Sequence, residues 1–194
     1  MNLPTLDNIQ ETMVKKNYAW FCRPESINLV GVRHPDSRSN AFNDWMTCTW
    51  CDAYGHWTFR RWPCTTDPGV YYREHPLNVN GTAIMVPGQY RGAYALGLHK
   101  GYEAIVQSKP IRVWRDNDKD EVLDWEGNTA SGLYGINIHR ASSTRTSNEV
   151  GKWSAGCQVL ANPHDFAELL AIVGRSCSHF GDRFTYTLLE GSEL

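Results

Sequence analysis

The order of apolar and polar positions predicts short β-strands over most of the chain. Between residues 27 and 156, runs rich in Val, Ile, Thr, Tyr and Trp are separated by Gly, Pro, Asn and Asp, a pattern typical of strands and turns. The segment 44–66, DWMTCTWCDAYGHWTFRRWPCTT, predicts a hairpin that turns near residues 54–56. Further turns are expected at Asn80-Gly81 and Pro87-Gly88, and further strands within 103–116, 132–140 and 183–190.

Two segments have the spacing of an amphipathic helix instead. The first follows Thr5 as N-cap, and its apolar face holds Leu6, Ile9 and Met13. The second follows Asn162 as N-cap, with Pro163 in its first turn, and its apolar face holds Phe166, Leu169, Leu170 and Val173. With 194 residues and neither a repeat nor a linker, the chain is predicted to be a single mainly β domain, 1–194, with a helix near each end.

The composition excludes binding by bulk charge. A formal net charge of -2 gives no overall attraction to nucleic acid or to an anionic membrane, and no segment approaches the roughly 20 apolar residues that span a bilayer. The start of the chain, MNLPTLDNIQETMVKKNYAWF, has no apolar stretch of signal-peptide length, so a cytoplasmic location and six free cysteines are expected. Eight Trp and nine Tyr provide flat surfaces suited to sugars or peptides, while the oligomeric state is left open.

A histidine and a cysteine stand out in the segment 136–160, INIHRASSTRTSNEVGKWSAGCQVL. His139 ends an apolar alternating run, and after fourteen intervening residues Ser154-Ala155-Gly156 leads into Cys157. A thiol attacks only as thiolate, and a neighbouring imidazole can take its proton. Taken singly, each residue is more simply explained as a structural one. The small residues before Cys157, however, allow a tight turn that leaves N–H groups free to face an oxyanion.

In combination, Gly135-Ile136-Asn137-Ile138-His139, the gap and Ser154-Ala155-Gly156-Cys157 resemble the signature of the L,D-transpeptidase catalytic domain family (YkuD type). That signature is a strand-borne histidine, a gap of about this length, and Ser/Thr-His-Gly-Cys. The segments TTDPG (65–69) and VPGQYRGAYALGLH (86–99) also resemble the family's substrate-side strands. The resemblance implies a β-sandwich with a capping helix that acts on peptidoglycan stem peptides without a cofactor.

The resemblance also implies a role for each matching residue. Cys157 is expected to be the nucleophile and His139 its base, with the backbone carbonyl of Arg140 orienting the imidazole and the N–H of Gly156 stabilising the oxyanion. An activated thiol of this kind is expected to have a depressed pKa. The expected substrate contacts are Tyr134, Arg145, Ser154 and Gln158.

The chain departs from the family pattern next to the cysteine. Ala155 replaces the second histidine, and Gln158-Val159 replaces a hydrophobic residue followed by Arg or Asn. Arg140 or Arg145 is a candidate for the missing carboxylate clamp, although a solvated loop charge is the simpler explanation of either one. Both L,D-transpeptidation and hydrolysis, as an L,D-carboxypeptidase or endopeptidase, are left open. A non-catalytic cell-wall-binding or virion module on the same fold is left open as well.

A wall-enzyme motif without an export signal predicts a phage or prophage origin, with release of the protein to the cell wall.

Acidic residues in the segment 116–124, DNDKDEVLD, have a spacing found in calcium loops. Asp116, Asp118, Asp120 and Asp124 fall at positions 1, 3, 5 and 9, whereas the usual Gly at 6 and Glu at 12 are Glu121 and Gly127. The alternatives are a structural calcium site and a solvated polar loop. A metal-stabilised structural protein is therefore a third functional hypothesis.

A second group of metal-ligand types is explained more simply. Cys48-x2-Cys51, Cys64 and His75 are zinc-ligand types, but alternating strand faces would point Cys48 and Cys51 to opposite sides, so structural thiols are predicted. Asn80-Gly81-Thr82 matches a glycosylation sequon, and we interpret it as a turn.

Overall fold

Strands dominate the computed structural model, which describes residues 3–38 and 40–194. The strands are β1 (Ile27–Arg33), β2 (Asp44–Cys51), β3 (Trp57–Thr65), β4 (Thr82–Met85), β5 (Gly88–His99), β6 (Tyr102–Gln107), β7 (Ile111–Asp116), β8 (Ala130–Gly132), β9 (Ile138–Arg140), β10 (Gln158–Leu160) and β11 (Arg183–Glu190). The helices are α1 (Leu6–Lys15), α2 (Val70–Glu74), α3 (Pro163–Phe180) and the final 3-10 turn η1 (Gly191–Glu193).

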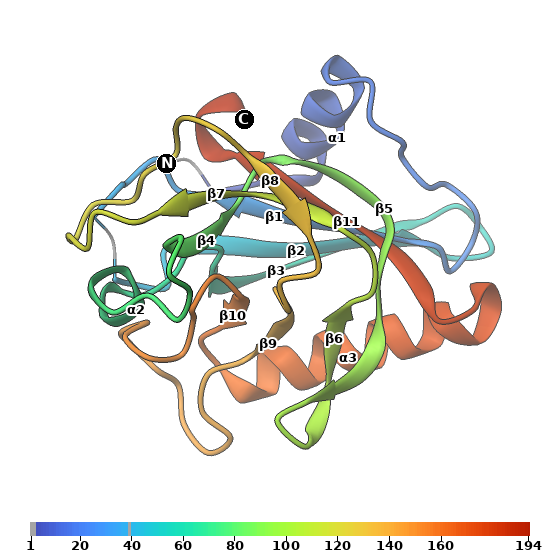
Figure 1. The fold of residues 1–194 in the computed structure, drawn as a ribbon. Helices are drawn as coiled ribbons and strands as arrows, with labels where there is room; N and C mark the ends of the chain where they lie inside the picture. The colour runs from blue at the N-terminus through green and yellow to red at the C-terminus, as the bar shows by residue number, and fades with distance from the viewer. Residues whose placement is uncertain (1–2, 39) are drawn as a thin grey trace.

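The main sheet closes on itself. Eight strands form a barrel in the order β1-β11-β5-β6-β9-β10-β3-β2, and β4-β7-β8 form a separate antiparallel sheet (Figure 1). The expected mainly β class is therefore confirmed, with a barrel-like main sheet and a small second sheet where the resemblance implied a sandwich. Closure depends on β1, in which Leu29 pairs with Cys48 of the antiparallel β2 and with Tyr186 of the parallel β11. The local alternation of apolar and polar residues does not predict a parallel pairing between such distant segments.

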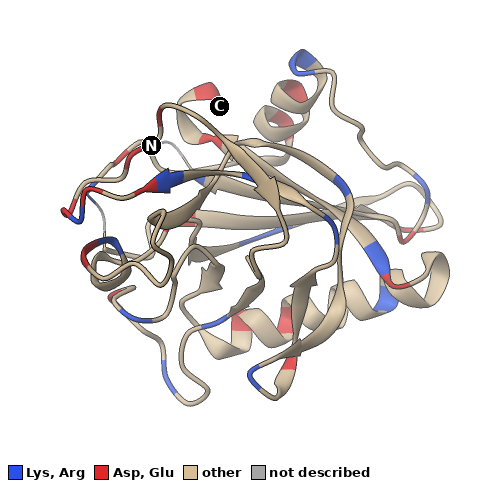
Figure 2. Cartoon of the chain, in the orientation of Figure 1, with Lys and Arg blue, Asp and Glu red and all other residues tan. Residues whose placement is uncertain are grey.

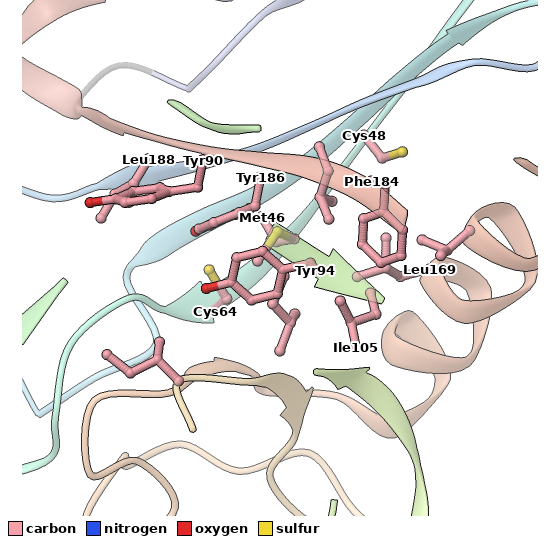
Figure 3. Close-up of a cluster of buried hydrophobic side chains, with 14 of the residues drawn as sticks. Met46, Cys48, Cys64, Tyr90, Tyr94, Ile105, Leu169, Phe184, Tyr186 and Leu188 are labelled. Carbon is pink, nitrogen blue, oxygen red and sulfur yellow. The ribbon is translucent and has the colours of Figure 1, made fainter. Parts of the chain in front are cut away.

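Apolar side chains fill the barrel, and α3 covers them from one side. Figure 3 shows part of this core, in which β5 and β11 contribute Tyr94 and Tyr186, packed edge to face with ring centroids 5.4 Å apart. The buried residues of α3 that pack there are Phe166, Leu169, Ile172 and Val173. The predicted helix is confirmed, with Asn162 accepting a hydrogen bond from the His164 N–H as its N-cap. Leu170, expected on the same face, is only partly buried.

The other predicted helix, α1, packs on the outside of the barrel. Thr5 accepts a hydrogen bond from the Asn8 N–H, and the Asn8 side chain returns one to the Thr5 N–H, which completes a capping box. Ile9 and Met13 of α1 are buried against a small cluster of strand residues, Val30, Val32 and Leu189. Strand β1 is consequently buried on both faces, inside the barrel and beneath α1.

A buried ionic network fixes the segment 65–69. The Arg33 guanidinium, which is fully buried, lies 2.9 Å from an Asp67 carboxylate oxygen and donates to the Met85 carbonyl over 2.9 Å. The Gly69 N–H donates to the Ser154 carbonyl over 3.0 Å. The segment TTDPG was expected on the substrate side, but the structure places it beneath the loop that precedes Cys157. The Asp67 carboxylate pairs with Arg33 inside the protein, and the segment 65–69 supports the loop before Cys157.

Candidate active site

One pocket brings the predicted histidine and cysteine together. It has a volume of about 430 Å³ and lies between the small sheet and the segments that lead into β9 and β10. Its lining residues include His139 and Cys157, together with Tyr134 and Ala155. The pocket therefore contains the whole pairing that the sequence singled out, and it is roomy enough for part of a peptide.

Strand pairing explains why the two side chains share this pocket. Strands β9 and β10 are parallel neighbours, and His139 lies opposite Val159. Because side chains alternate along a strand, Cys157, two residues before Val159, is directed to the same side as His139. Gly156 has a φ of +117°, and a Cβ there would lie 2.3 Å from the Ala83 carbonyl oxygen of β4. Only glycine allows the chain to pass so close to the small sheet on its way to Cys157.

The His139 ring is held in one tautomer. Its Nδ1 lies 2.8 Å from the Arg140 carbonyl oxygen, and the Tyr102 hydroxyl is 3.3 Å from the same nitrogen. Because a carbonyl only accepts hydrogen bonds, Nδ1 carries the hydrogen and Nε2 keeps its lone pair. Burial lowers the pKa of His139 to about 4. At neutral pH the ring is therefore an uncharged base, oriented by the carbonyl that the resemblance assigns to this role.

A second imidazole, which the sequence did not single out, stacks on the first. The rings of His99 and His139 are 4.1 Å apart between centroids and 11° from parallel. The Asn137 side-chain amide donates to His99 Nδ1 over 3.1 Å, which orients the ring. His99 comes from the end of β5, within the segment 86–99. The chain has no histidine at position 155, but its pocket holds a second imidazole from another strand.

The Cys157 thiol is neutral in this arrangement. Its sulfur lies 3.4 Å from the Gly135 carbonyl oxygen, to which the thiol donates. Burial raises the pKa of Cys157, although the Asn137 backbone N–H and the Lys100 ammonium oppose that rise. The pKa of the Cys157 thiol is therefore raised, whereas a depressed pKa was expected for an activated thiol. Thiol and imidazole are therefore both uncharged at neutral pH.

Two expected roles around the turn before Cys157 are corrected because their polar atoms are engaged internally. The Gly156 N–H donates to Ser154 Oγ over 3.1 Å, so it is not free to face an oxyanion. Ser154 is fully buried and its hydroxyl donates to the Cys157 carbonyl over 2.7 Å, so it holds the turn and does not contact substrate. The Cys157 N–H makes no hydrogen bond within the described residues, so it is the free N–H group of this turn.

The other three expected substrate contacts lie in different environments. Gln158 is fully buried, its amide donates to the Thr66 carbonyl over 3.2 Å, and it accepts from the Tyr186 hydroxyl over 2.8 Å. It therefore belongs to the core of the barrel. Arg145 is exposed on the loop after β9 and does not line the pocket. Tyr134 does line the pocket, where the Arg115 guanidinium lies 4.8 Å from the centre of its ring.

Positive charge gathers in the pocket although the whole chain is slightly acidic. Lys100, Arg115 and Lys152 line it, and none of the described lining residues is acidic. The Arg115 guanidinium also donates to the Gly81 carbonyl over 3.1 Å, which fixes its position at the wall. These cations come from three separate segments, so no local motif in the sequence marks them. Together they favour an anionic ligand.

The two groups of metal-ligand residue types in the sequence have different outcomes. All six cysteines are free, and Cys48, Cys51 and Cys64 are buried, whereas His75 is exposed. In the part of the chain that the structure describes, metal-ligand side chains gather closely enough to hold an ion only at the end of β7, in a group made of Asp116, Asp118 and Asp124. Asp120, the fourth aspartate expected there, lies outside that group.

Comparisons of the chain with known protein families, with curated sequences and with solved structures found no match. Among the described residues, no helix is both long and apolar enough to cross a membrane.

Proposed function

We propose that the protein carries out cysteine-dependent acyl transfer or hydrolysis on peptidoglycan stem peptides, on an L,D-transpeptidase-like fold. The observation that carries the proposal is the pocket shared by Cys157 and His139, in which the Arg140 carbonyl holds Nδ1 at 2.8 Å and leaves Nε2 as the base. A mainly β domain with α3 placed after the cysteine agrees with the family resemblance.

The chemistry follows from these groups. Cys157 Sγ attacks the peptide carbonyl carbon while His139 Nε2 takes the thiol proton, and the Cys157 N–H stabilises the oxyanion. The C–N bond then breaks, and the amine leaves with the proton from His139. Water or a second amine attacks the thioester, His139 removes its proton, and the thiol forms again. Attack by water gives trimming or cleavage, and attack by an amine gives a crosslink.

The charge of the pocket supports the substrate class. Stem peptides carry free carboxylates, and Lys100, Arg115 and Lys152 are the cations that would meet them. Arg115 is the best placed for bidentate binding of a carboxylate, because its guanidinium is already fixed by the Gly81 carbonyl and the Tyr134 ring. We propose Arg115 for this contact instead of Arg140 or Arg145, the candidates from the sequence.

The test is mass spectrometry of purified muropeptides, with tetrapeptide stems and dimers, after incubation with wild type, Cys157→Ala, His139→Ala and Cys22→Ser. Cys22 is an exposed thiol outside the pocket and serves as the matched control. We expect loss of the terminal D-residue or a new crosslink, abolished by Cys157→Ala and reduced by about 10²–10⁴-fold by His139→Ala. Cys22→Ser should retain full activity.

The alternative of a non-catalytic wall-binding or virion module is favoured by one observation, the neutral resting thiol. If no muropeptide changes with wild type while the protein still co-sediments with purified cell walls, independently of Cys157, the binding module replaces the enzyme. If the protein neither reacts nor co-sediments, both proposals fail.

A further inference from the structure

Carboxylates meet at the end of β7, on the opposite side of the strand from the pocket. Arg115 faces the pocket, and the next residue, Asp116, points the other way, as alternation along a strand requires. Figure 2 shows that acidic residues follow one another along the loop between β7 and β8. Of these, Asp116, Asp118 and Asp124 each place a carboxylate oxygen within 4.8 Å of the others.

Asp116 is the unusual member of this group. Its side chain is fully buried, and neither carboxylate oxygen has a hydrogen-bond partner within residues 3–38 and 40–194. A buried carboxylate without a partner is strongly unfavourable unless it is neutralised or binds a cation. Burial, together with the charges of Asp124 and Asp118, raises the pKa of Asp116 to about 7, although Arg73 opposes that rise.

The surrounding backbone holds Asp116 in this position. Asp116 pairs with Thr82 of β4. The chain at Gly81 passes so close that a Cβ there would lie 2.2 Å from the Asp116 carbonyl oxygen. The loop itself is anchored at Leu123, whose N–H donates to the Ser37 carbonyl over 2.8 Å. The buried Arg73 guanidinium also donates to the Glu121 carbonyl. The three carboxylates therefore converge because the loop is fixed at several points.

We propose that Asp116, Asp118 and Asp124 bind a hard divalent cation, with Ca²⁺ the favoured ion. Three carboxylates without a thiolate or an imidazole are a ligand set for a hard ion. Oxygens up to 4.8 Å apart fit two ligands of one Ca²⁺, whose bonds are about 2.4 Å long, better than the shorter bonds of Mg²⁺. Backbone carbonyls and water complete the coordination. The site does not depend on the proposed function of the pocket.

A cation bound at this site would affect the wall of the pocket. Asp116 and Arg115 are consecutive residues of β7, and their partners Thr82 and Ala83 line the pocket. A cation at Asp116 fixes the end of β7 and the loop that follows it. It thereby stiffens the wall that carries Arg115 without entering the pocket.

The experiment measures the melting temperature of chelator-treated protein as CaCl2 is added, with NaCl at matched ionic strength as the control. We expect a rise of about 5–10 °C once Ca²⁺ exceeds its Kd about 100-fold. Terbium added to the same protein should luminesce on tryptophan excitation, because Trp125 adjoins Asp124.

Asp120→Asn is the matched control for Asp118→Asn and Asp124→Asn. All three remove one charge from the same loop, but Asp120 lies outside the group, and its side-chain oxygen accepts from the Val122 N–H. Asp118→Asn and Asp124→Asn should lose the calcium response and the terbium signal, while Asp120→Asn should keep both. A wild type that does not respond to calcium, an equal rise with NaCl, or an equal loss in Asp120→Asn would overturn the site.

Discussion

The imidazole rings of His99 and His139 stack 4.1 Å apart between centroids, although they come from strands almost forty residues apart. The neighbouring ring covers one face of His139, and its charge would oppose a proton on His139. The resemblance expects a second imidazole beside the cysteine, at position 155. In this fold β5 supplies a second ring, and it lies against the base.

His99→Ala should change the titration of His139. Removing the stacked ring admits water to the imidazole, so the pKa of His139 should rise towards its ordinary value of 6.5. NMR titration of the His139 ring protons measures this directly, and the acidic limb of the activity profile should move in the same direction. His99→Phe keeps a ring over His139 and should restore the wild-type pKa. An unchanged pKa in His99→Ala would show that the stack has no effect on the base.

Burial of His139 makes stability depend on pH. Its pKa is about 4 in the folded protein and 6.5 ordinarily, so the unfolded chain binds more protons between these values. The free energy of unfolding should therefore be highest above pH 6.5 and fall by roughly 3 kcal/mol as the pH drops to 4. Urea unfolding of wild type and His139→Gln at pH 7, 5 and 4 isolates this contribution from other titrating groups. The difference between the two proteins should shrink as the pH falls, and a constant difference would contradict the shift.

Alkylation of Cys157 should be slow at neutral pH. Burial raises the pKa of the thiol above its ordinary value of 9.0, so thiolate forms only in alkaline solution. Mass spectrometry of peptides after brief iodoacetamide treatment should show Cys22, which is exposed, modified before Cys157 at pH 7. The Cys157 rate should still be rising beyond pH 9. Faster labelling of Cys157 than of Cys22 at pH 7 would instead indicate a preformed thiolate.

Gly156→Ala should be strongly destabilising. An added Cβ would lie 2.3 Å from the Ala83 carbonyl oxygen, and the φ of +117° is strained for any other residue. We expect a loss of about 2–4 kcal/mol and a displaced Cys157. Gly174→Ala is the matched control, because it lies in α3 and a Cβ there meets nothing within 4 Å. That control should gain up to about 1 kcal/mol in denaturant unfolding. Equal effects of the two substitutions would contradict the close approach at Gly156.

Arg115→Gln should weaken binding of an anionic substrate. The substitution keeps polarity but removes the charge fixed between the Gly81 carbonyl and the Tyr134 ring, so KM should rise about tenfold with a smaller change in kcat. Arg145→Gln, on an exposed loop outside the pocket, should leave both constants unchanged. A rise in KM for Arg145→Gln but not for Arg115→Gln would indicate that Arg145 binds the carboxylate.

Local features of the fold are readable from the sequence, and long-range ones are not. Thr5, Asn162 and the 54–56 turn act through neighbours in the chain, and all three are confirmed. The short helix α2 was missed because Val70–Glu74 is too brief to show a period. Barrel closure was missed because it depends on which strands pair, and alternation of apolar residues specifies only which face is buried.

The candidate site divides in the same way. His139 and Cys157 were found because they lie within one recognisable segment, and the structure places both in one pocket. Ser154 and Gln158 lie in that segment too, but their bonds to the Cys157 carbonyl and the Tyr186 hydroxyl bury them. His99 and Arg115 reach the pocket from β5 and β7, and no spacing in the sequence predicts that they lie close together.

The parallel pairing of β1 with β11 also determines when the barrel can close during synthesis. Arg33 ends β1 and pairs with Glu190 of β11, 157 residues later, so the barrel cannot close until β11 has left the ribosome. Until then β1 has β2 on one edge and an open edge on the other, with apolar residues on both faces. Contacts over such a separation slow folding, and an open apolar edge invites pairing with other chains. The nascent chain is therefore most prone to aggregation just before β11 emerges.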